Sequence, residues 1–461
     1  MTAKLSAPAI TQLNNQINSE MARLHIPGVA VGVILGNETY TAGFGVTSLD
    51  NPLAITADTL FQIGSITKTI TALAVMRLVE ADKLDLDVPL RKYLPELHMA
   101  DEFVAERVTL RHIFTHTGGW LGDYFDDLGA GEDALAKIVT HMVNLPQDTP
   151  LGEIWSYNNA GFYLAGRLLE LATGKPYEVA VKELVLNPIG MMDSFFFPAD
   201  LMTRRFAVGH EAVYPPEHRS PQILTPWALA RTSNPLGGLA STINDLLRYA
   251  HVQMSDGLSE TGERLLSPEL FSQMHTPTVT AANGEFMGIA WFIRQANGVR
   301  LIHHGGATNG QMATLTIAPQ ERFAFTVLTN SDRGSELYQP LTRWALEQFI
   351  GVQERDPEPL EATEAQLAEY VGNYDAAADE IQISLHQGQL VLQNIPKGGF
   401  PMQDSPPSPQ PPPVRLALCG PDQVLILDEP GKGNQGEFIR GAQGELAWLR
   451  IGGRVHKRMD E

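Results

Sequence analysis

The sequence predicts an α/β fold, namely an α/β sandwich with an antiparallel sheet and a helical insert, followed by a separate all-β domain. Three observations predict this architecture. Strand-like apolar runs stand near the start of the chain and again after residue 288. A long stretch with helical periodicity separates these two groups. Short alternating runs fill the last ~100 residues, as in a small barrel.

The first elements are a helix and a hairpin. An amphipathic pattern predicts a helix over residues 8–25 that ends before Pro27-Gly28. Val29–Leu35 is a continuous apolar run, and after the turn signal at Gly36-Asn37 residues 38–46 alternate between apolar and polar types. The pattern therefore predicts a hairpin whose first strand is buried.

The middle of the chain is mostly helical. A broad apolar face predicts a helix from Ser65 to about Ala81. Another helix is expected near Thr242, with Ser241 as its N-cap. Further helical patterns cover residues 108–116, 132–144, 159–173 and 177–186.

Strands return before the end of the first domain, which we place at residues 1–352. They are expected at 288–294, 300–304, 312–317 and 323–330, before a closing helix at 341–350. Residues 353–365 are acidic and contain proline, as in a linker. The all-β domain then covers 366–461, with strands expected at 381–385, 389–393, 414–418, 424–428, 437–439 and 446–451. Prolines crowd residues 401–413 and exclude a central strand there, so this interval is expected to be an extended loop.

Composition limits the classes of partner and location. The net charge of -20 opposes binding to nucleic acid or to an anionic membrane. Cys419 is the only cysteine, so an intramolecular disulfide and a thiolate zinc site are excluded. The N-terminus lacks the pattern of a signal peptide, and no apolar run reaches the about 18 residues that span a bilayer. We therefore expect a cytoplasmic protein with no membrane or nucleic-acid partner, and a homo-oligomer is left open.

The tetrad Ser65-Ile66-Thr67-Lys68 places an alcohol and an amine at the start of a predicted helix. Positions i and i+3 share a helix face, so the Lys68 amine should lie beside the Ser65 hydroxyl. A buried lysine can lose its proton near neutral pH and act as a base. The alternative is that Ser65 only caps the helix and Lys68 lies on a solvated face. The tetrad alone favours this alternative.

Two further motifs carry polar groups. Tyr157 and Asn159 stand just before a helical pattern, where a phenol can exchange a proton with Ser65 and a carboxamide can hold a substrate carbonyl. His304 and Gly306 end a predicted strand, where paired glycines let a substrate backbone approach the strand edge. Singly, each motif has a structural alternative: a core aromatic, a helix cap or a turn histidine.

In this order, S-x-x-K, Y-x-N and H-x-G resemble the motifs of the serine β-lactamase-like and penicillin-binding protein superfamily, in the form found in class C β-lactamases, D-aminopeptidases and related esterases. The resemblance covers roughly residues 10–350 and implies a β-lactamase/transpeptidase-like fold there. The segment Tyr370–Tyr374 resembles the start of the lipocalin-like barrel appended to some peptidases and peptide-cyclising thioesterases of this superfamily.

The resemblance implies that Ser65 is the acylated nucleophile and that Lys68 and Tyr157 share the role of general base. His304, where many relatives carry lysine, would supply a switchable charge or a hydrogen bond to Tyr157. Asn159 and Gly306 would bind substrate. The backbone N–H groups of Ser65 and Ala307 would form the oxyanion hole.

Two departures from the family pattern argue against a dedicated β-lactamase: histidine replaces lysine at 304, and Gly118 stands where relatives often have serine. We therefore expect a serine hydrolase that cleaves amide or ester bonds of short peptides, including peptides with D-residues, or of small esters. Peptide cyclisation by acyl transfer, weak β-lactamase activity and a non-catalytic penicillin-binding sensor stay open as alternatives. His112 and His116 lie four residues apart but lack the H-E-x-x-H glutamate and a third ligand, so no metal and no cofactor are expected.

Overall fold

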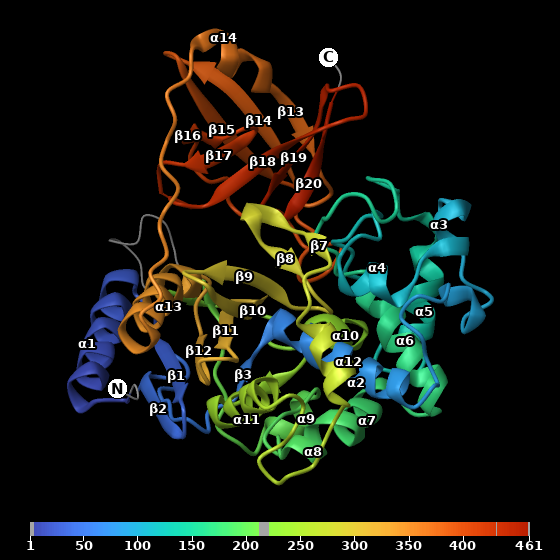
Figure 1. Ribbon diagram of the computed structural model, residues 1–461, viewed down its shortest axis with the longest axis vertical. Coiled ribbons are helices and arrows are strands. Elements are labelled where there is room, and N and C mark those ends of the chain that lie inside the picture. Colours follow the sequence, from blue (N-terminus) through green and yellow to red (C-terminus); the bar gives the residue numbers. More distant parts are fainter. Residues whose placement is uncertain (1–3, 212–220, 430, 460–461) are drawn as a thin grey trace.

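The computed structural model describes residues 4–211, 221–429 and 431–459, which form an α/β domain and a barrel beside it (Figure 1). None of the helices in these residues is both long and apolar enough to cross a membrane. The fold class expected from the sequence is confirmed. Strands from both ends of the α/β domain share one antiparallel sheet, and the helical segment lies between them in sequence.

The sheet has the strand order β2-β1-β12-β11-β10-β9-β8-β7 in the described residues. Its first hairpin is β1 (Gly28–Leu35) with β2 (Glu38–Gly45), and β1 also pairs with β12 (Phe323–Thr329) from about 300 residues later in the chain. The remaining strands are β11 (Gln311–Ala318), β10 (Val299–Thr308), β9 (Phe292–Ala296), β8 (Phe286–Met287) and β7 (Val279–Thr280).

Strand β1 is buried on both faces because it separates two cores. Val29, Val31 and Val33 pack against α1 (Ala7–Leu24) and α13 (Gly334–Ile350). Ala30 and Ile34 belong to the larger core on the helical side. Successive side chains of a strand point to opposite faces, so a strand with a core on each face needs apolar residues at every position.

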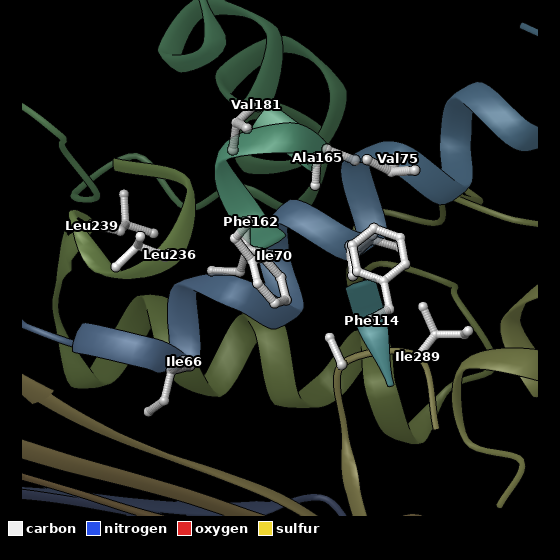
Figure 2. Close-up of a cluster of buried hydrophobic side chains, with 14 of the residues drawn as sticks. Ile66, Ile70, Val75, Phe114, Phe162, Ala165, Val181, Leu236, Leu239 and Ile289 are labelled. Atoms are coloured by element: carbon white, nitrogen blue, oxygen red, sulfur yellow. The ribbon is translucent and has the colours of Figure 1, made fainter. Parts of the chain in front are cut away.

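Helix α2 (Thr67–Glu80) is the centre of the helical region, and every residue from Thr67 to Met76 is buried. Figure 2 shows Ile66 and Ile70 at the start of this helix, with Phe114 and Phe162 packed nearby. Lys68, near the start of α2, is buried because the whole helix start lies inside the domain. The other helices are α3 (Glu102–Arg107), α4 (Leu110–Phe114), α5 (Ala134–His141), α6 (Gly161–Thr173), α7 (Tyr177–Val181), α8 (Asn187–Ile189), α9 (Pro198–Leu201), α10 (Asn234–Gly237), α11 (Ile243–Met254) and α12 (Pro268–Met274).

The expected N-cap of α11 is wrong by one residue. Thr242 is the cap, and its hydroxyl accepts a hydrogen bond from the Asp245 amide at 3.2 Å. Ser241 instead belongs to the short strand β6 (Ala240–Ser241), which pairs with β3 (Phe61–Gln62). Its hydroxyl lies 2.8 Å from the Ser194 hydroxyl, so tertiary pairing takes Ser241 out of the helix start.

The C-terminal strands close into a barrel, which fits the expected lipocalin-like domain. They are β13 (Gly372–Asp375), β14 (Asp379–His386), β15 (Gln389–Pro396), β16 (Val414–Gly420), β17 (Gln423–Ile426), β18 (Gln435–Arg440), β19 (Leu446–Ile451) and β20 (Arg454–Arg458). The barrel closes where β13 pairs with β20, the two strands that the sequence pattern did not predict. The proline-rich residues 401–413, all of them described, contain no helix or strand, as expected.

Candidate active site

Ser65 lies in the tight turn that leads into α2. Residues Gly64–Ile66 form a short 3-10 turn, and α2 follows directly. The Lys68 amine donates hydrogen bonds to the Ser65 hydroxyl at 3.1 Å and to the Leu236 carbonyl at 2.6 Å. Lys68 is completely buried, so the alternative of a solvated lysine is wrong.

The surroundings of Lys68 disfavour its charged form. Burial lowers the pKa of Lys68 well below its ordinary value, and the positive charge of Arg454 lowers it further, whereas Asp123 acts in the opposite direction. The amine lies 5.1 Å from the centre of the Tyr157 ring and 5.3 Å from that of Phe162. A lysine in this environment can be a neutral amine with a free lone pair near neutral pH.

Two glycines let β10 approach the Ser65 turn backbone to backbone. Gly64 has a positive φ of 51°, and a Cβ there would lie 2.6 Å from the Ala307 nitrogen. A Cβ on Gly306 would lie 1.9 Å from the Ile63 carbonyl oxygen and 3.1 Å from the Ser65 nitrogen. Because glycine has no side chain, the backbone around Ala307 can lie beside the backbone of Ser65. Ser65 and Ala307 are the two residues whose amides were expected to form the oxyanion hole.

Tyr157 stands in a stack of rings at the side of Ser65. Its ring stacks with the His116 ring at 4.4 Å and with the Phe292 ring at 6.4 Å, measured between ring centres. No partner lies in good hydrogen-bond geometry with its buried hydroxyl among the described residues, but the Ser65 hydroxyl is near enough to interact with it. Burial raises the pKa of Tyr157 well above its ordinary value, although Ser65 and the charge of Arg454 act in the opposite direction. The phenol is therefore protonated at neutral pH.

His304 is held as a neutral imidazole. Its Nδ1 lies 2.6 Å from the Gly305 carbonyl oxygen, and its Nε2 has no partner in the described part of the chain. Burial lowers the pKa of His304 to about 3, although the hydrogen bond to the Gly305 carbonyl acts in the opposite direction. Of the two roles expected for this residue, a pKa of about 3 favours hydrogen bonding over a charge that switches near neutral pH.

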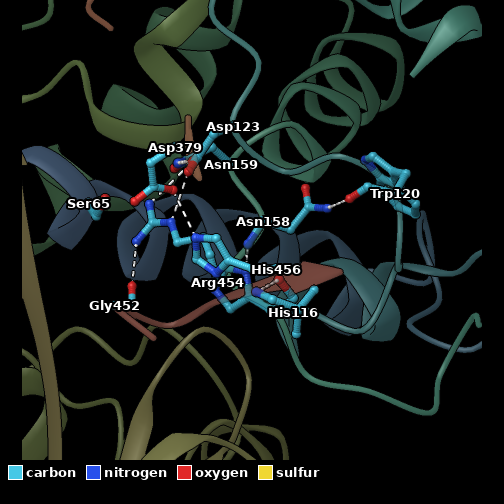
Figure 3. Close-up of polar contacts among 12 residues, drawn as sticks. Ser65, His116, Trp120, Asp123, Asn158, Asn159, Asp379, Gly452, Arg454 and His456 are labelled. Carbon is cyan, nitrogen blue, oxygen red and sulfur yellow. Dashed lines mark hydrogen bonds and ion pairs between the residues drawn. The ribbon is translucent and has the colours of Figure 1, made fainter. Parts of the chain in front are cut away.

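Asn159 lies beside two residues that the sequence analysis did not single out. Its side-chain amide donates a hydrogen bond to Asp123 at 2.6 Å, and Asp123 forms an ion pair with Arg454 at 2.9 Å (Figure 3). Burial alone would raise the pKa of Asp123, but Arg454 and Asn159 lower it below its ordinary value. Asn159 does not cap α6, whose N-cap is Ala160, and the Asn158 side-chain oxygen accepts a hydrogen bond from the Gly161 amide at 2.8 Å.

Arg454 comes from the barrel, directly after the Gly452-Gly453 turn between β19 and β20. Its guanidinium lies 4.8 Å from the centre of the Tyr157 ring. Asp123 and Arg454 are 331 positions apart and belong to no motif, so no sequence signal could have paired them. The structure thus adds a charge pair from two domains to the residues predicted from the motifs.

His112 and His116 serve separate structural contacts. The His112 Nδ1 lies 2.9 Å from the Thr109 hydroxyl in the capping box of α4. The His116 Nδ1 accepts a hydrogen bond from the Asn158 amide at 2.9 Å, which fixes the segment before Asn159. Burial lowers the pKa of His116 well below its ordinary value, so this ring is neutral too.

Ser65 opens into a cleft of about 1090 Å³ between the α/β domain and the barrel. The predicted site residues that line it are Ser65, Tyr157, Asn159, His304, Gly306 and Ala307, whereas Lys68 lies beneath Ser65. The barrel contributes Arg454 and the segment Ala377–Asp379. The motif residues therefore lie together at this cleft, and barrel residues that belong to no motif form another side of it.

Comparisons with known proteins agree with this arrangement. The sequence pattern of the family described as Beta-lactamase matches residues 13–348. Penicillin-binding protein 4 of Amycolatopsis lactamdurans is 30% identical over 361 residues, which cover 76% of this chain and 93% of that protein. Unguisins hydrolase ungD' of Aspergillus campestris is 25% identical over 333 residues, or 69% of this chain and 61% of that protein.

The likeness in fold extends over both domains. The crystal structure of SurE has a TM-score of 0.76 at 24% sequence identity, over 97% of this chain and 99% of that chain. SurE has also been solved with D-Leu, and that structure has a TM-score of 0.74. The family match over most of the α/β domain and the relative at 30% identity show that this chain belongs to the β-lactamase family, within the serine hydrolase superfamily.

Proposed function

We propose that this protein is a serine hydrolase that forms an acyl-enzyme on Ser65 and cleaves amide or ester bonds of short peptides, including peptides with D-residues, or of small esters. The observation that carries the proposal is the 3.1 Å contact between the Ser65 hydroxyl and the buried Lys68 amine at the floor of the cleft. A nucleophile and a base in hydrogen-bond range are the first requirement of covalent catalysis.

In the first step, the neutral Lys68 amine accepts the proton of Ser65 while Oγ attacks the substrate carbonyl carbon. The lowered pKa of Lys68 supports this assignment, because a charged ammonium has no lone pair to accept a proton. Negative charge develops on the carbonyl oxygen, which the backbone amides of Ser65 and Ala307 stabilise. The dipole of α2 adds to this stabilisation.

In the second step, the tetrahedral intermediate collapses and the bond to the leaving group breaks. The protonated Tyr157 phenol donates its proton to the leaving amine or alcohol, and the Lys68 ammonium returns a proton to the phenolate. Arg454, with its guanidinium 4.8 Å from the centre of the Tyr157 ring, stabilises the transient phenolate. Water then attacks the acyl-enzyme by the reverse sequence of proton transfers.

The cleft offers two means of holding a peptide. Past His303, β10 pairs with β11 and with no other described strand, and residues 305–307 line the cleft, where an extended backbone can pair with a strand edge. Asn159, oriented by Asp123, faces the same cleft with its carboxamide. SurE, which shares this fold, has been solved with D-Leu, and peptides with D-residues therefore belong in the substrate panel.

The test is the mass of the acyl adduct formed with a panel of p-nitrophenyl esters and of L- and D-residue peptide thioesters. We expect an adduct on Ser65 that disappears in Ser65→Ala, together with all turnover and all labelling by a fluorophosphonate probe. Ser6→Ala is the matched control, because Ser6 caps α1 away from the cleft and its loss costs only about 1 kcal/mol of stability. An adduct on another residue, or turnover that survives in Ser65→Ala, would disprove the proposal. Free acid as the released product indicates hydrolysis, and a macrocycle indicates acyl transfer.

A further inference from the structure

The cleft does not end at the residues around Ser65, because it continues into one end of the barrel. Four apolar side chains from inside the barrel line this end: Ile381, Leu392, Val414 and Ile426. They lie on four neighbouring strands, β14 to β17, and Leu392 stands directly opposite Val414. We call these four residues, together with Phe400 at the rim, the barrel mouth.

Other side chains inside the barrel do not line the cleft. Tyr370 and Tyr374 pack against Phe438, with ring centres 4.6 and 5.6 Å from that of Phe438, and none of these three rings lines the cleft. A barrel of this size can hold side chains or one small ligand inside.

The proline-rich loop between β15 and β16 forms the outer rim of the mouth. Phe400 and several glycine and proline residues of this loop line the cleft. Phe400 is 40% exposed and packs edge-on against Phe125 of the α/β domain, with 5.1 Å between the ring centres. The loop thus joins the mouth to the α/β wall, so that one continuous cleft leads from Ser65 to the barrel interior.

We propose that the barrel mouth is a second subsite of this cleft, which binds apolar side chains of a peptide substrate several residues away from the carbonyl that Ser65 attacks. This inference rests on the proposed function for the reacting end of the substrate. It adds a substrate class to that function: oligopeptides with apolar residues remote from the reacting carbonyl.

The lining distinguishes a peptide from a plain acyl chain. Asn394, Asn434 and Gln435 stand among the apolar residues of the cleft and offer hydrogen bonds to backbone amides, which a hydrocarbon chain cannot use. The volume of about 1090 Å³ also exceeds the range of about 300–1,000 Å³ that is usual for small ligands. A small ester would leave most of this cleft empty.

The test measures binding in the full-length Ser65→Ala chain, so that it does not depend on turnover. The probe is a dansyl-labelled hexapeptide acid of leucine and phenylalanine, compared with a dansyl hexapeptide of glycine and serine. We expect the apolar peptide to bind at least about tenfold more tightly, because burying one large apolar side chain is worth that much. Leu392→Asn and Phe400→Ala should each remove most of this preference. Leu418→Asn is the matched control, since Leu418 packs on the barrel core and does not line the cleft.

Phe400→Ala distinguishes loss of binding from loss of folding, because this exposed side chain lies on a loop and its removal leaves the barrel core intact. Thermal melting of each variant verifies the fold. Equal binding of the two peptides, or a preference that survives both variants, would overturn the inference. Tighter binding of dansyl-labelled decanoic acid than of the apolar peptide would overturn the peptide assignment. Failure of Ser65 to be acylated would overturn the proposed function alone, because peptide binding to the mouth is measured separately.

Discussion

The backbone amide of Tyr157 donates a hydrogen bond to the carbonyl of Gly453 at 2.8 Å, so the barrel is attached directly to the segment that carries the phenol. The next contact is similar: the Arg450 guanidinium donates to the Trp155 carbonyl at 2.8 Å. Arg454 then lies against the Tyr157 ring. The hairpin of β19 and β20 therefore forms part of the site, and changes in it should alter chemistry at Ser65.

Tyr157→Phe should lower turnover by at least about a hundredfold, the usual scale for loss of a general acid or base. Stability should hardly change, because no partner lies in good hydrogen-bond geometry with the buried hydroxyl among the described residues. Steady-state kinetics with a p-nitrophenyl ester and with a peptide substrate measure the effect. The loss should be larger for the amide, whose leaving group needs a proton. Turnover close to that of the parent would show that Tyr157 is not the proton donor to the leaving group and would leave this role to Lys68.

Arg454→Met should move the acidic limb of the pH profile of kcat/KM to higher pH. Activity requires the neutral Lys68 amine, so it is lost as the pH falls through the pKa of Lys68 in the folded protein. Burial lowers this pKa most, Arg454 lowers it further, and Asp123 raises it. Without Arg454 the pKa of Lys68 rises. Asp123→Asn should shift the limb in the opposite direction, to lower pH.

The double variant Arg454→Met/Asp123→Asn is the control for these two shifts, because it removes both charges together. Its acidic limb should lie between those of the single variants. Profiles measured from pH 5 to 10 with a p-nitrophenyl ester decide the matter. Shifts of the same sign in both single variants would show that a general loss of structure, and not charge, is responsible.

His304 should stay neutral from pH 8 to pH 5, with its proton on Nδ1. Burial holds the pKa of His304 at about 3, and the Gly305 carbonyl accepts from Nδ1. The unfolded chain takes up this proton near the ordinary histidine pKa of about 6.5, so His304 makes the folded state less stable as pH falls from that value toward 3. Long-range proton–nitrogen NMR of the imidazoles, with His304→Gln for assignment, reports the protonation state. A protonation midpoint of His304 near pH 6.5 would instead support the role of a charge that switches near neutral pH.

Gly64→Ala should destabilise the protein by about 3 kcal/mol or more and abolish acylation. The new Cβ would combine a positive φ with a clash of 2.6 Å against the Ala307 nitrogen. Gly36→Ala is the matched control, since Gly36 has a similar φ of 62° and open space around it, and should cost only about 1 kcal/mol. Chemical denaturation measures both. Equal losses would mean that the backbone conformation alone, and not the approach of β10, requires glycine at 64.

Local features of the site could be predicted from the sequence because they depend on neighbouring residues. The contact of Ser65 with Lys68 follows from helix geometry over three positions. The N-terminal hairpin follows from alternation and a turn signal. In contrast, β20 was missed because its sequence, RVHKR, is short and basic, and its partner strand β13 is shorter still. Ser241 was misplaced because its pairing partner is far away in sequence.

The sequence by itself determined the fold class, the order of the motifs and the pairing of an alcohol with an amine, since periodicity and i to i+3 spacing are local properties. Only the tertiary structure decided the lowered pKa values of Lys68 and His304, because these depend on burial among distant segments. It also decided that Asp123 and Arg454 form a charge pair beside Ser65 and that the barrel extends the cleft. Electrostatic fields and cavities arise from groups that come together only when the chain folds, so a local sequence pattern does not predict them.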